Sequence, residues 1–383
     1  MRIKSLLIGL SFFWCSGVSA VEAMKLSPDA RVSVLTCSPG EELYSLFGHS
    51  AIRVYDPNHK IDHVFNYGTF TFDDDFYLNF AMGRLNYRLS VQDYGSFLKG
   101  YFYEQRYVFE QELNLDSAQR QTIFNYLFWN QLPENRYYLY DFFYKNCSSV
   151  IRDVLTTTLG ESLEFKDLTY DDHPSFRQMI DVYLVHHPWG DFGIDLGLGL
   201  PCDKIPTSYE YMFLPHELER AIEHATLDGE LLAKPPYQVI EGKSLQSSFS
   251  IFNPVPLFWL LAGVVAILSA LAIRRNKPAT WLDYILLTAY GLLGCLITFL
   301  WFFTDHNATG PNLNVLWAWP IHLPALMVPF FSKRLFGRYM AVYAITCLIT
   351  LLLFPLLPQQ LHLATIPLMV AALARGLNHV LVQ

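Results

Sequence analysis

The sequence predicts an α+β exported domain followed by an all-α bundle of about five transmembrane helices. Three observations lead to this prediction: an export signal at the front, an acidic middle region, and a series of long apolar runs in the last third. Only 16% of the 383 residues are charged, against roughly 25% in an average soluble domain, and 52% are hydrophobic. This composition excludes a disordered chain, and with the net charge of −8 it excludes a nucleic-acid binder.

Residues 1–20 read as a signal peptide. Arg2 and Lys4 precede an apolar run, and the small residues Val18 and Ala20 fit a signal-peptidase site. We expect cleavage after Ala20, with an uncleaved anchor helix as the alternative. The region that follows is therefore expected outside the cytoplasm.

Residues 21–253 form the predicted exported domain. They include 33 acidic and 18 basic residues, which gives a net charge of −15. A strand is predicted over residues 49–57, because it is entered through Gly48 and ended by an Asp-Pro pair. A second strand is predicted over residues 62–70.

Residues 254–383 form the predicted membrane bundle. Their apolar runs are mostly close to the ~20 residues that span a bilayer, and they occupy residues 255–273, 282–303, 316–331, 339–357 and 361–374. The only acidic residues here are Asp283 and Asp305, beside seven basic ones. If the first run crosses inward, all seven basic residues fall on the cytoplasmic side, as the positive-inside rule expects.

Two of these runs depart from a simple crossing. Pro320 and Pro324 interrupt the run over residues 316–331, so a re-entrant segment is the alternative there. The run over residues 361–374 is short unless Arg375 extends toward the lipid headgroups.

Cys147 has the surroundings of a nucleophile. Apolar residues at helical spacing predict a helix that starts near Cys147 and ends at Gly160, with Asn146 as its N-cap. In the first helical turn, unpaired N–H groups and the helix dipole stabilise a thiolate and lower its pKa. The same N–H groups form one wall of an oxyanion hole. Taken alone, the Asn-Cys-Ser-Ser stretch favours a structural cysteine over a nucleophile.

His49 supplies the second group. It stands at the start of the first predicted strand, and Asn66 lies on the second strand, where it would orient the imidazole, with His63 as the other candidate. A base, an orienting group and a later nucleophile make a Cys-His triad in circularly permuted order. The alternatives are a hydrogen-bonded strand histidine for His49 and a turn residue for Asn66.

The remaining exported cysteines leave two alternatives open. In an oxidising compartment Cys37 and Cys202 form a disulfide, or else both stay reduced as small core residues. The sequence has no Cys-x-x-Cys or His-Glu-x-x-His motif, no Gly-x-Ser-x-Gly elbow and no glycine-rich phosphate loop. We therefore predict no metal site and no cofactor.

Six ordered motifs resemble one known family, the Lnb-type periplasmic domain of diderm bacteria with its following membrane helices. These motifs occupy residues 35–54, 65–70, 138–147, 197–203, 212–215 and 305–317. The Lnb-type domain is similar to circularly permuted papain-like enzymes of the NlpC and LRAT type. The resemblance implies that fold for the exported domain.

The resemblance also implies an activity. A lipoprotein N-acyltransferase would move an acyl chain from a phospholipid, through a cysteine thioester, to the α-amino group of the lipidated N-terminal cysteine of a diacylated lipoprotein. Carried over to this chain, Cys147 is the nucleophile, His49 the general base and Asn66 the third member. The implied location is the bacterial inner membrane, with the catalytic domain in the periplasm.

Three further residues are candidates for substrate binding. Arg53 could pair with a lipid phosphate, while His306 and Asn312, on the predicted outside loop, could contact a headgroup or the acceptor amine. The alternatives to acyl transfer are a membrane-tethered cysteine hydrolase, either a phospholipase or a cell-wall peptidase or amidase, and a non-enzymatic receptor on the same fold. Thiol chemistry alone does not distinguish an amine from water as the second substrate.

Overall fold

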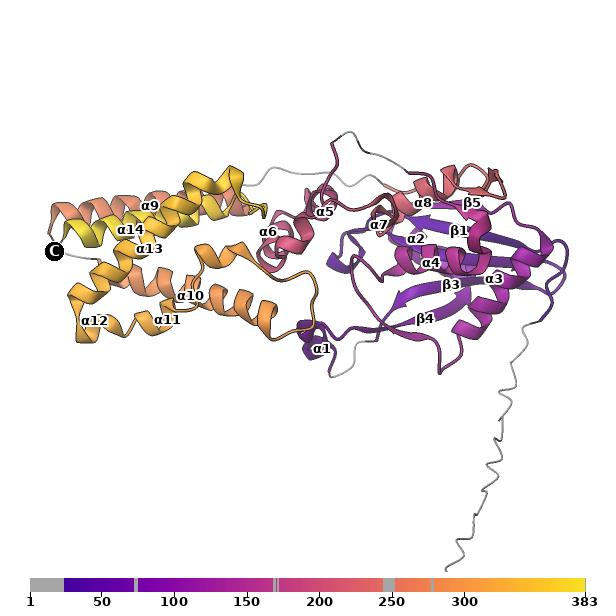
Figure 1. The fold of residues 1–383 in the computed structure, drawn as a ribbon, viewed down its shortest axis with the longest axis horizontal. Coiled ribbons are helices and arrows are strands. Elements are labelled where there is room, and N and C mark those ends of the chain that lie inside the picture. The colour runs from indigo at the N-terminus through magenta and orange to yellow at the C-terminus, as the bar shows by residue number, and fades with distance from the viewer. Residues whose placement is uncertain are drawn as a thin grey trace, which may run out of the picture.

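The computed structural model describes residues 24–71, 75–167, 170, 172–243, 252–276 and 279–382. The predicted signal peptide, residues 1–20, and the basic residue Lys277 lie outside this part of the chain. Figure 1 shows a domain built on a twisted sheet and an elongated bundle of helices, which meet end to end.

The domain is built on a seven-stranded sheet in the order β10-β5-β1-β2-β3-β4-β6, with every neighbouring pair antiparallel. Its strands are β1 (Arg31–Cys37), β2 (His49–Asp56), β3 (Ile61–Thr69), β4 (Asn86–Asp93), β5 (Val108–Glu112), β6 (Tyr137–Leu139) and β10 (Tyr237–Ile240). A small second sheet comprises β7 (Leu163–Glu164), β8 (Thr226–Leu227) and β9 (Glu230–Leu231). The two strands predicted at the sequence level are confirmed as β2 and β3.

Helices cover both faces of the large sheet. Those of this domain are α1 (Phe76–Met82), α2 (Tyr94–Tyr103), α3 (Ser117–Asn130), α4 (Cys147–Leu159), α5 (Phe176–Leu184), α6 (Pro188–Gly197), α7 (Ser208–Tyr211) and α8 (Pro215–His224). Helices α3, α4 and α8 pack on one face around Ile52 and Phe65, and α2 packs on the other around Ala51 and Val64. The helix predicted at Cys147 is confirmed, with Asn146 as its N-cap and Gly160 as its C-cap.

Among its described residues, the membrane half contains three helices that are long and apolar enough to cross a bilayer, over Pro254–Arg274, Thr280–Phe302 and Lys333–Leu356. They correspond to α9 (Pro254–Arg274), α10 (Thr280–Phe302) and α13 (Lys333–Leu353). A shorter apolar helix, α14 (Thr365–Leu381), packs along α9 and α13.

The predicted third run, residues 316–331, is not one helix. It is divided among η4 (Leu313–Leu316), α11 (His322–Ala325) and α12 (Val328–Phe331). Proline lacks the N–H group that a continuous helix requires. Pro320 lies between η4 and α11, and Pro324 lies within the four-residue α11. The expected count of five crossings is therefore not confirmed.

Arg375 does not extend toward the headgroups. It is buried, and its guanidinium donates to both carboxylate oxygens of Asp283 at 2.7 and 3.0 Å and to Ser269 Oγ at 3.0 Å. His379 Nε2 bonds to the same carboxylate at 2.8 Å. Because an unpaired charge within a bilayer is costly, this partner explains how α14 carries an arginine.

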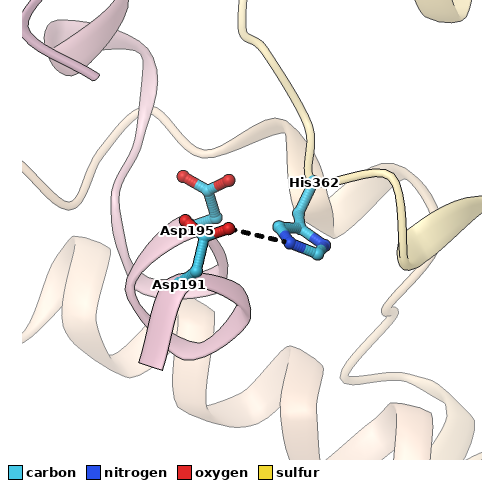
Figure 2. Close-up of side chains that lie close together, drawn as sticks. All are labelled: Asp191, Asp195 and His362. Carbon is cyan, nitrogen blue, oxygen red and sulfur yellow. Dashed lines mark hydrogen bonds and ion pairs between the residues drawn. The ribbon is translucent and has the colours of Figure 1, made fainter. Parts of the chain in front are cut away.

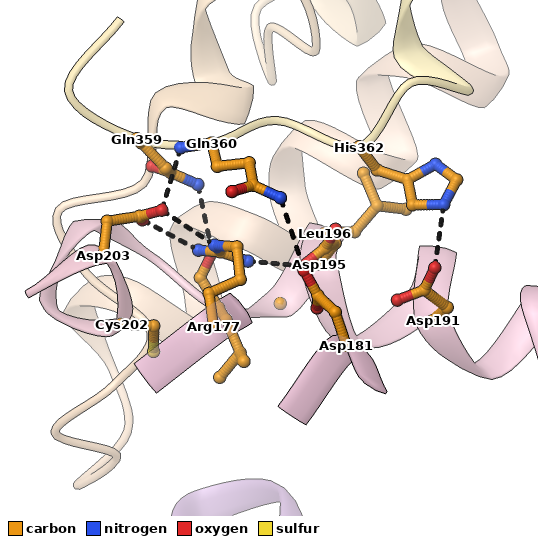
Figure 3. Close-up of polar contacts among 12 residues, drawn as sticks. Arg177, Asp181, Asp191, Asp195, Leu196, Cys202, Asp203, Gln359, Gln360 and His362 are labelled. Carbon is orange, nitrogen blue, oxygen red and sulfur yellow. Dashed lines mark hydrogen bonds and ion pairs between the residues drawn. The ribbon is translucent and has the colours of Figure 1, made fainter. Parts of the chain in front are cut away.

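A polar junction of five residues, Arg177, Asp195, Asp203, Gln359 and Gln360, connects the two halves (Figure 3). The fully buried Arg177 bonds to both aspartates, one on α6 and one in the following 3₁₀ turn. From the membrane half, Gln360 N–H donates to Asp203 Oδ1 at 2.9 Å, and Gln359 Nε2 donates to the carbonyl of Leu198 at 3.1 Å. The sheet domain and its following helices are therefore held on the bundle by directional bonds.

An Arg177→Ala variant should lose much of the stability of this junction. Removing one partner of a buried ion pair leaves the carboxylates of Asp195 and Asp203 uncompensated, which costs about 3–5 kcal/mol. Thermal unfolding of the detergent-solubilised protein measures the loss. The matched control is Arg84→Ala, which removes an exposed ion pair to Asp305 of the membrane half. The Arg84 and Asp305 side chains are 58% and 61% exposed. That variant should cost no more than about 1 kcal/mol, so equal losses would contradict the role given to Arg177.

Candidate active site

Cys147 is the first residue of α4, and its position is fixed by the cap of that helix. Asn146 Oδ1 accepts from the backbone N–H groups of Ser148 at 2.9 Å and Ser149 at 3.0 Å. The Asn146 amide in turn donates to the carbonyl of Phe213 at 2.7 Å, which joins the cap to another part of the domain. The N–H of Cys147 itself is one of the donors that an α-helix leaves unused at its start, so it points a dipole at the thiol region.

His49 and Asn66 come from the two neighbouring strands β2 and β3. The Nε2–H of His49 donates to Asn66 Oδ1 at 2.6 Å. The imidazole also hydrogen-bonds to the Cys147 side chain, for which Nδ1 is the remaining nitrogen. The backbone N–H of Ser50 donates to the same sulfur. The structure thus brings Cys147, His49 and Asn66 into one chain of hydrogen bonds.

Gly68 lies where the start of α4 meets the sheet. It lies at an irregularity in the pairing of β3 with β4 and has a φ of +88°. A Cβ atom at this position would lie 3.7 Å from Cys147 Cβ and 4.0 Å from His49 Cε1. Because an L side chain is strained at this φ, glycine gives the strand its turn toward the thiol.

The electrostatics of the pair favour a thiolate beside an imidazolium. Burial by itself disfavours the charge on Cys147, but His49 and hydrogen bonds from His49 and Ser50 outweigh it and lower the pKa of the thiol from 9.0 to about 7. Burial likewise opposes the charge on His49, whereas the Cys147 charge and the bonds to Cys147 and Asn66 raise its pKa above 6.5. A half-buried thiolate at neutral pH is a nucleophile.

Alkylation of the purified protein should therefore single out Cys147. The rate with iodoacetamide should rise with a midpoint near pH 7, because the thiolate is lost as the pH falls through the pKa of about 7. Cys37 and Cys202 should stay unmodified at that pH, since burial raises the pKa of each thiol to about 12. Peptide mapping by mass spectrometry measures the site, and a midpoint near 9 would contradict the ion pair.

An Asn66→Ala variant should slow the reaction of Cys147 without removing it. Losing the bond to Nε2 frees the imidazole to rotate, and removing such an orienting partner typically costs about 10- to 100-fold. The midpoint of the alkylation profile should also move upward, which a merely structural change would not cause. Asn66→Gln, which keeps the amide group, should retain more activity than Asn66→Ala, and equal rates for both variants would contradict the orienting role.

His63, the other candidate for orienting His49, does not lie at the site. It is exposed, and it stands three residues before Asn66 on the same strand. Since successive strand residues face opposite sides of a sheet, it points away from the imidazole.

The three further candidate residues have other partners. Arg53 lies over the ring of Tyr94 and bonds to Asp62 at 2.7 Å and Glu110 at 3.0 Å, so its guanidinium is already neutralised. Asn312 is fully buried and caps the turn that follows it. His306 Nε2 bonds to the carbonyl of Phe80 at 3.0 Å. In this structure each is committed to the fold and none lies in the hydrogen-bonded chain at Cys147.

The two remaining cysteines of the domain are free thiols. Cys37 is on β1, directly opposite His49, and packs in the core beneath α2. Cys202 is buried near the membrane half, with Sγ 3.6 Å from the carbonyl oxygen of Ala308. Of the two alternatives, the reduced state is the one observed.

Two backbone features at the site were not anticipated from the sequence: the N–H of Ser50, which bonds to the thiol, and Gly68, whose positive φ turns the strand beside it. The signal for Gly68 was present, because a glycine inside a strand pattern indicates a bulge or a close approach of backbone. No sequence signal identifies a single N–H group on a strand. Tyr140 is a third addition, since burial and the nearby Cys147 charge raise the pKa of its phenol well above its usual value.

Asp191, Asp195 and His362 also lie together, with one ligand atom of each within 4.8 Å of the others (Figure 2). The His362 imidazole uses Nδ1 to accept from the N–H of Ala364 at 3.0 Å. Its proton is therefore on Nε2, which donates to Asp191 Oδ2 at 3.2 Å. A nitrogen that carries a proton is no metal ligand, and Asp195 is already bonded to Arg177, so the group acts as a contact between the two halves.

Comparison with known families agrees with this architecture. The family model described as the Lnb N-terminal periplasmic domain matches residues 20–181, and the one described as the Lnb transmembrane domain matches residues 246–383. No curated protein and no solved structure matches the chain. The order of the two matches and the apolar helices indicate a multi-pass inner-membrane protein with its N-terminal domain in the periplasm. The chain therefore belongs to the Lnb family, which is a family of membrane enzymes of lipoprotein biogenesis.

Proposed function

We propose that this protein is a lipoprotein N-acyltransferase that takes an acyl chain from a phospholipid. The acceptor is the α-amino group of the lipidated N-terminal cysteine of a lipoprotein. The observation that carries the proposal is the hydrogen-bonded chain of Cys147, His49 and Asn66, in a domain bonded to the outer end of a membrane bundle. A thiolate at that position suits an ester that lies at the membrane interface.

In the first half-reaction the Cys147 thiolate attacks the carbonyl carbon of the phospholipid ester. The negative charge that develops on the carbonyl oxygen is stabilised by the backbone N–H of Cys147, since those of Ser148 and Ser149 already donate to Asn146. The ester C–O bond then breaks, and the His49 imidazolium gives its proton to the departing oxygen. The products are an acyl thioester on Cys147 and a lysophospholipid with a free hydroxyl group.

In the second half-reaction the neutral amine of the acceptor attacks the thioester carbon. His49, now neutral, takes a proton from the attacking nitrogen, and the C–S bond breaks to release the thiolate. One ester and one amine have become one alcohol and one amide, so no oxidant or reductant is required. Asn66 holds the imidazole in one orientation through both steps.

The charge of the exported domain indicates that the domain reaches the lipid surface because it is tethered to the membrane helices. With a net charge of −15 over residues 21–253, the domain is repelled by anionic lipid surfaces. The polar junction and the membrane helices supply the contact that electrostatics would not.

The test uses purified full-length protein in phospholipid vesicles that contain a synthetic diacylated lipopeptide. Acyl transfer should increase the mass of the lipopeptide by one acyl group at its N-terminal amine and release lysophospholipid in equal amount. If lysophospholipid and free fatty acid appear while the lipopeptide stays unchanged, the protein is a hydrolase that uses water. In cells, the N-terminal mass of lipoproteins should change in the same way when the gene is removed.

A further inference from the structure

Helix α6 lies across the periplasmic end of the membrane bundle. Near its start, the ring of Trp189 packs on that of Phe258, in the first turns of α9, with the two centroids 5.7 Å apart. At its end, a Cβ atom on Gly197 would lie 3.9 Å from Leu300, shortly before α10 ends. Figure 1 shows α5 and α6 between the sheet domain and the bundle. Because α9 and α10 are both long enough to cross a bilayer, a helix that contacts the same end of each lies at the membrane surface.

The turn that precedes β2 packs on α5 and α6. This turn is η1 (Leu43–Ser45). A Cβ atom on Gly190, in the first turn of α6, would lie 3.9 Å from Leu43 Cδ1. Phe47, two residues before β2, has its ring centroid 5.9 Å from that of Tyr183 on α5. The start of β2, which carries the base of the triad, is therefore close to the membrane surface as well.

Backbone hydrogen bonds close this turn on itself. The carbonyl of Ser45 accepts from the N–H of Gly40 at 2.9 Å and from the N–H of Gly48 at 3.1 Å. The side chains of Ser45 and Leu46 are buried. Since the inward side of the turn is fixed in this way, its outward side chains are presented in a defined position.

Four large apolar side chains are exposed along this contact, and together we call them the interfacial patch. They are 59%, 69%, 62% and 46% exposed, in the order Leu43, Tyr44, Val185 and Trp189. Val185 lies one helical turn after Asp181, whose carboxylate accepts from Gln360 of the membrane half at 3.3 Å, so it is on the side of α5 that faces the bundle. Large apolar side chains that are exposed together indicate an interaction surface.

The surroundings of the interfacial patch indicate that a lipid surface covers it. Next to the contact with Phe258, Trp259 and Leu260 of the spanning helix α9 are 48% and 65% exposed and face lipid. Tryptophan and tyrosine are the side chains that favour the boundary between headgroups and acyl chains. Glu41 and Glu42, beside the turn, are also exposed, and because carboxylates avoid hydrocarbon they limit the turn to that boundary.

We infer that the interfacial patch inserts into the periplasmic leaflet and holds the start of β2, with His49, against the lipid. Removing these apolar side chains from water supplies the free energy of the contact. The bundle brings the domain to the bilayer, and the patch adds a second contact on the domain itself, beside its site. This inference is independent of whether the thiol passes an acyl group to an amine or to water.

The experiment measures the depth of a nitroxide spin label on the full-length protein. The background carries Cys15→Ala, Cys147→Ala and Cys295→Ala, because the other three cysteines, Cys37, Cys202 and Cys347, are buried. The label is attached through one introduced cysteine at a time, in Leu43→Cys, Tyr44→Cys or Val185→Cys. The protein is reconstituted in vesicles of phosphatidylethanolamine and phosphatidylglycerol.

The matched control is Leu231→Cys, which replaces a leucine that is 55% exposed. The carbonyl of Leu231 accepts from the amide of Asn114 at 3.0 Å. Asn114 follows β5 at the end where that strand pairs with Ser33, whereas the start of β2 lies beside Cys37 at the other end. The control is therefore an equally exposed leucine at the end of the sheet that is farther from the bundle.

Labels on the interfacial patch should collide more often with dissolved oxygen, which concentrates in lipid, than with a water-soluble nickel chelate. The order should be reversed for Leu231→Cys. If the patch labels behave like the control, the patch faces water in a pure lipid vesicle, and a lipid occupant is excluded in favour of a protein partner or none.

A second measurement needs no variant. A phospholipid with a diazirine in its acyl chain is added to the wild-type protein in the same vesicles and activated by light. The label should appear on the peptides that contain Leu43, Tyr44, Val185 and Trp189, and not on the peptide that contains Leu231. Labelling confined to the membrane helices would overturn the inference. Neither measurement depends on catalysis, so the proposed function stands or fails separately.

Discussion

A Cys147→Ala variant is expected to form no acyl-enzyme and to leave lipoprotein N-termini unmodified. Removing the nucleophile of a triad removes the covalent intermediate, and such losses are on the order of 10⁶-fold. The fold should persist, because the cap of α4 depends on Asn146, Ser148 and Ser149 rather than on the thiol. The measurements are the mass of the protein after incubation with phospholipid and the mass of the lipopeptide acceptor.

The controls for Cys147→Ala are Cys37→Ala and Cys202→Ala. Both residues are buried free thiols whose pKa is raised to about 12, so neither should carry acyl groups. Each control should retain the transfer activity of the folded protein. Acyl transfer by a Cys147→Ala variant would exclude the thioester route, and an acyl group found on Cys37 or Cys202 would place the chemistry elsewhere.

A His49→Ala variant is expected to lose about 10²- to 10⁴-fold in the rate of acyl transfer, the range for removal of a general acid–base. Two effects act together. The leaving oxygen no longer receives a proton, and the thiol loses the neighbouring charge that lowers its pKa to about 7. The midpoint of Cys147 alkylation should therefore rise from near pH 7 to 9.0 or above, since burial then acts without compensation.

His63→Ala is the matched control for this variant. His63 is an exposed histidine on β3, on the opposite face from Asn66. Its removal should leave both the transfer rate and the alkylation midpoint of Cys147 unchanged. If His49→Ala lowers the transfer rate but leaves the midpoint near pH 7, the thiolate is stabilised by the helix start alone, and His49 acts only in proton transfer.

Local patterns predicted the elements of the candidate site. The strands β2 and β3 and the helix that starts at Cys147 follow from turn residues, spacing and an N-cap, all of which are properties of neighbouring residues. The order of base, orienting group and nucleophile then followed from the order of those elements. The meeting of the three side chains is a tertiary feature. Gly68, which lies beside Cys147 and His49, takes its positive φ at an irregularity in the pairing of β3 with β4.

The substrate-binding candidates could not be judged in this way, because their partners are distant in sequence. The sequence suggests Arg53 as a phosphate ligand. In the fold, however, it bonds to Glu110, which lies two strands away in the sheet. Asn312 reads as a loop residue, yet its amide bonds to the carbonyl of Leu196, 116 residues earlier. The buried pairing of Arg375 with Asp283 is likewise a tertiary contact. Residue type and spacing do not predict which charged side chains will pair in the folded protein.

The polar junction has a consequence for which molecules the enzyme can meet. Since Gln359 and Gln360 of the bundle bond to Leu198 and Asp203, and Arg177 holds Asp203 in place, the thiol is held at one height above the bilayer. Under the proposed function, donor and acceptor must then reach that height while both are embedded in the same leaflet. Donor and acceptor would then meet the enzyme only by lateral diffusion in the membrane. A lipoprotein that has already left the inner membrane would not be a substrate.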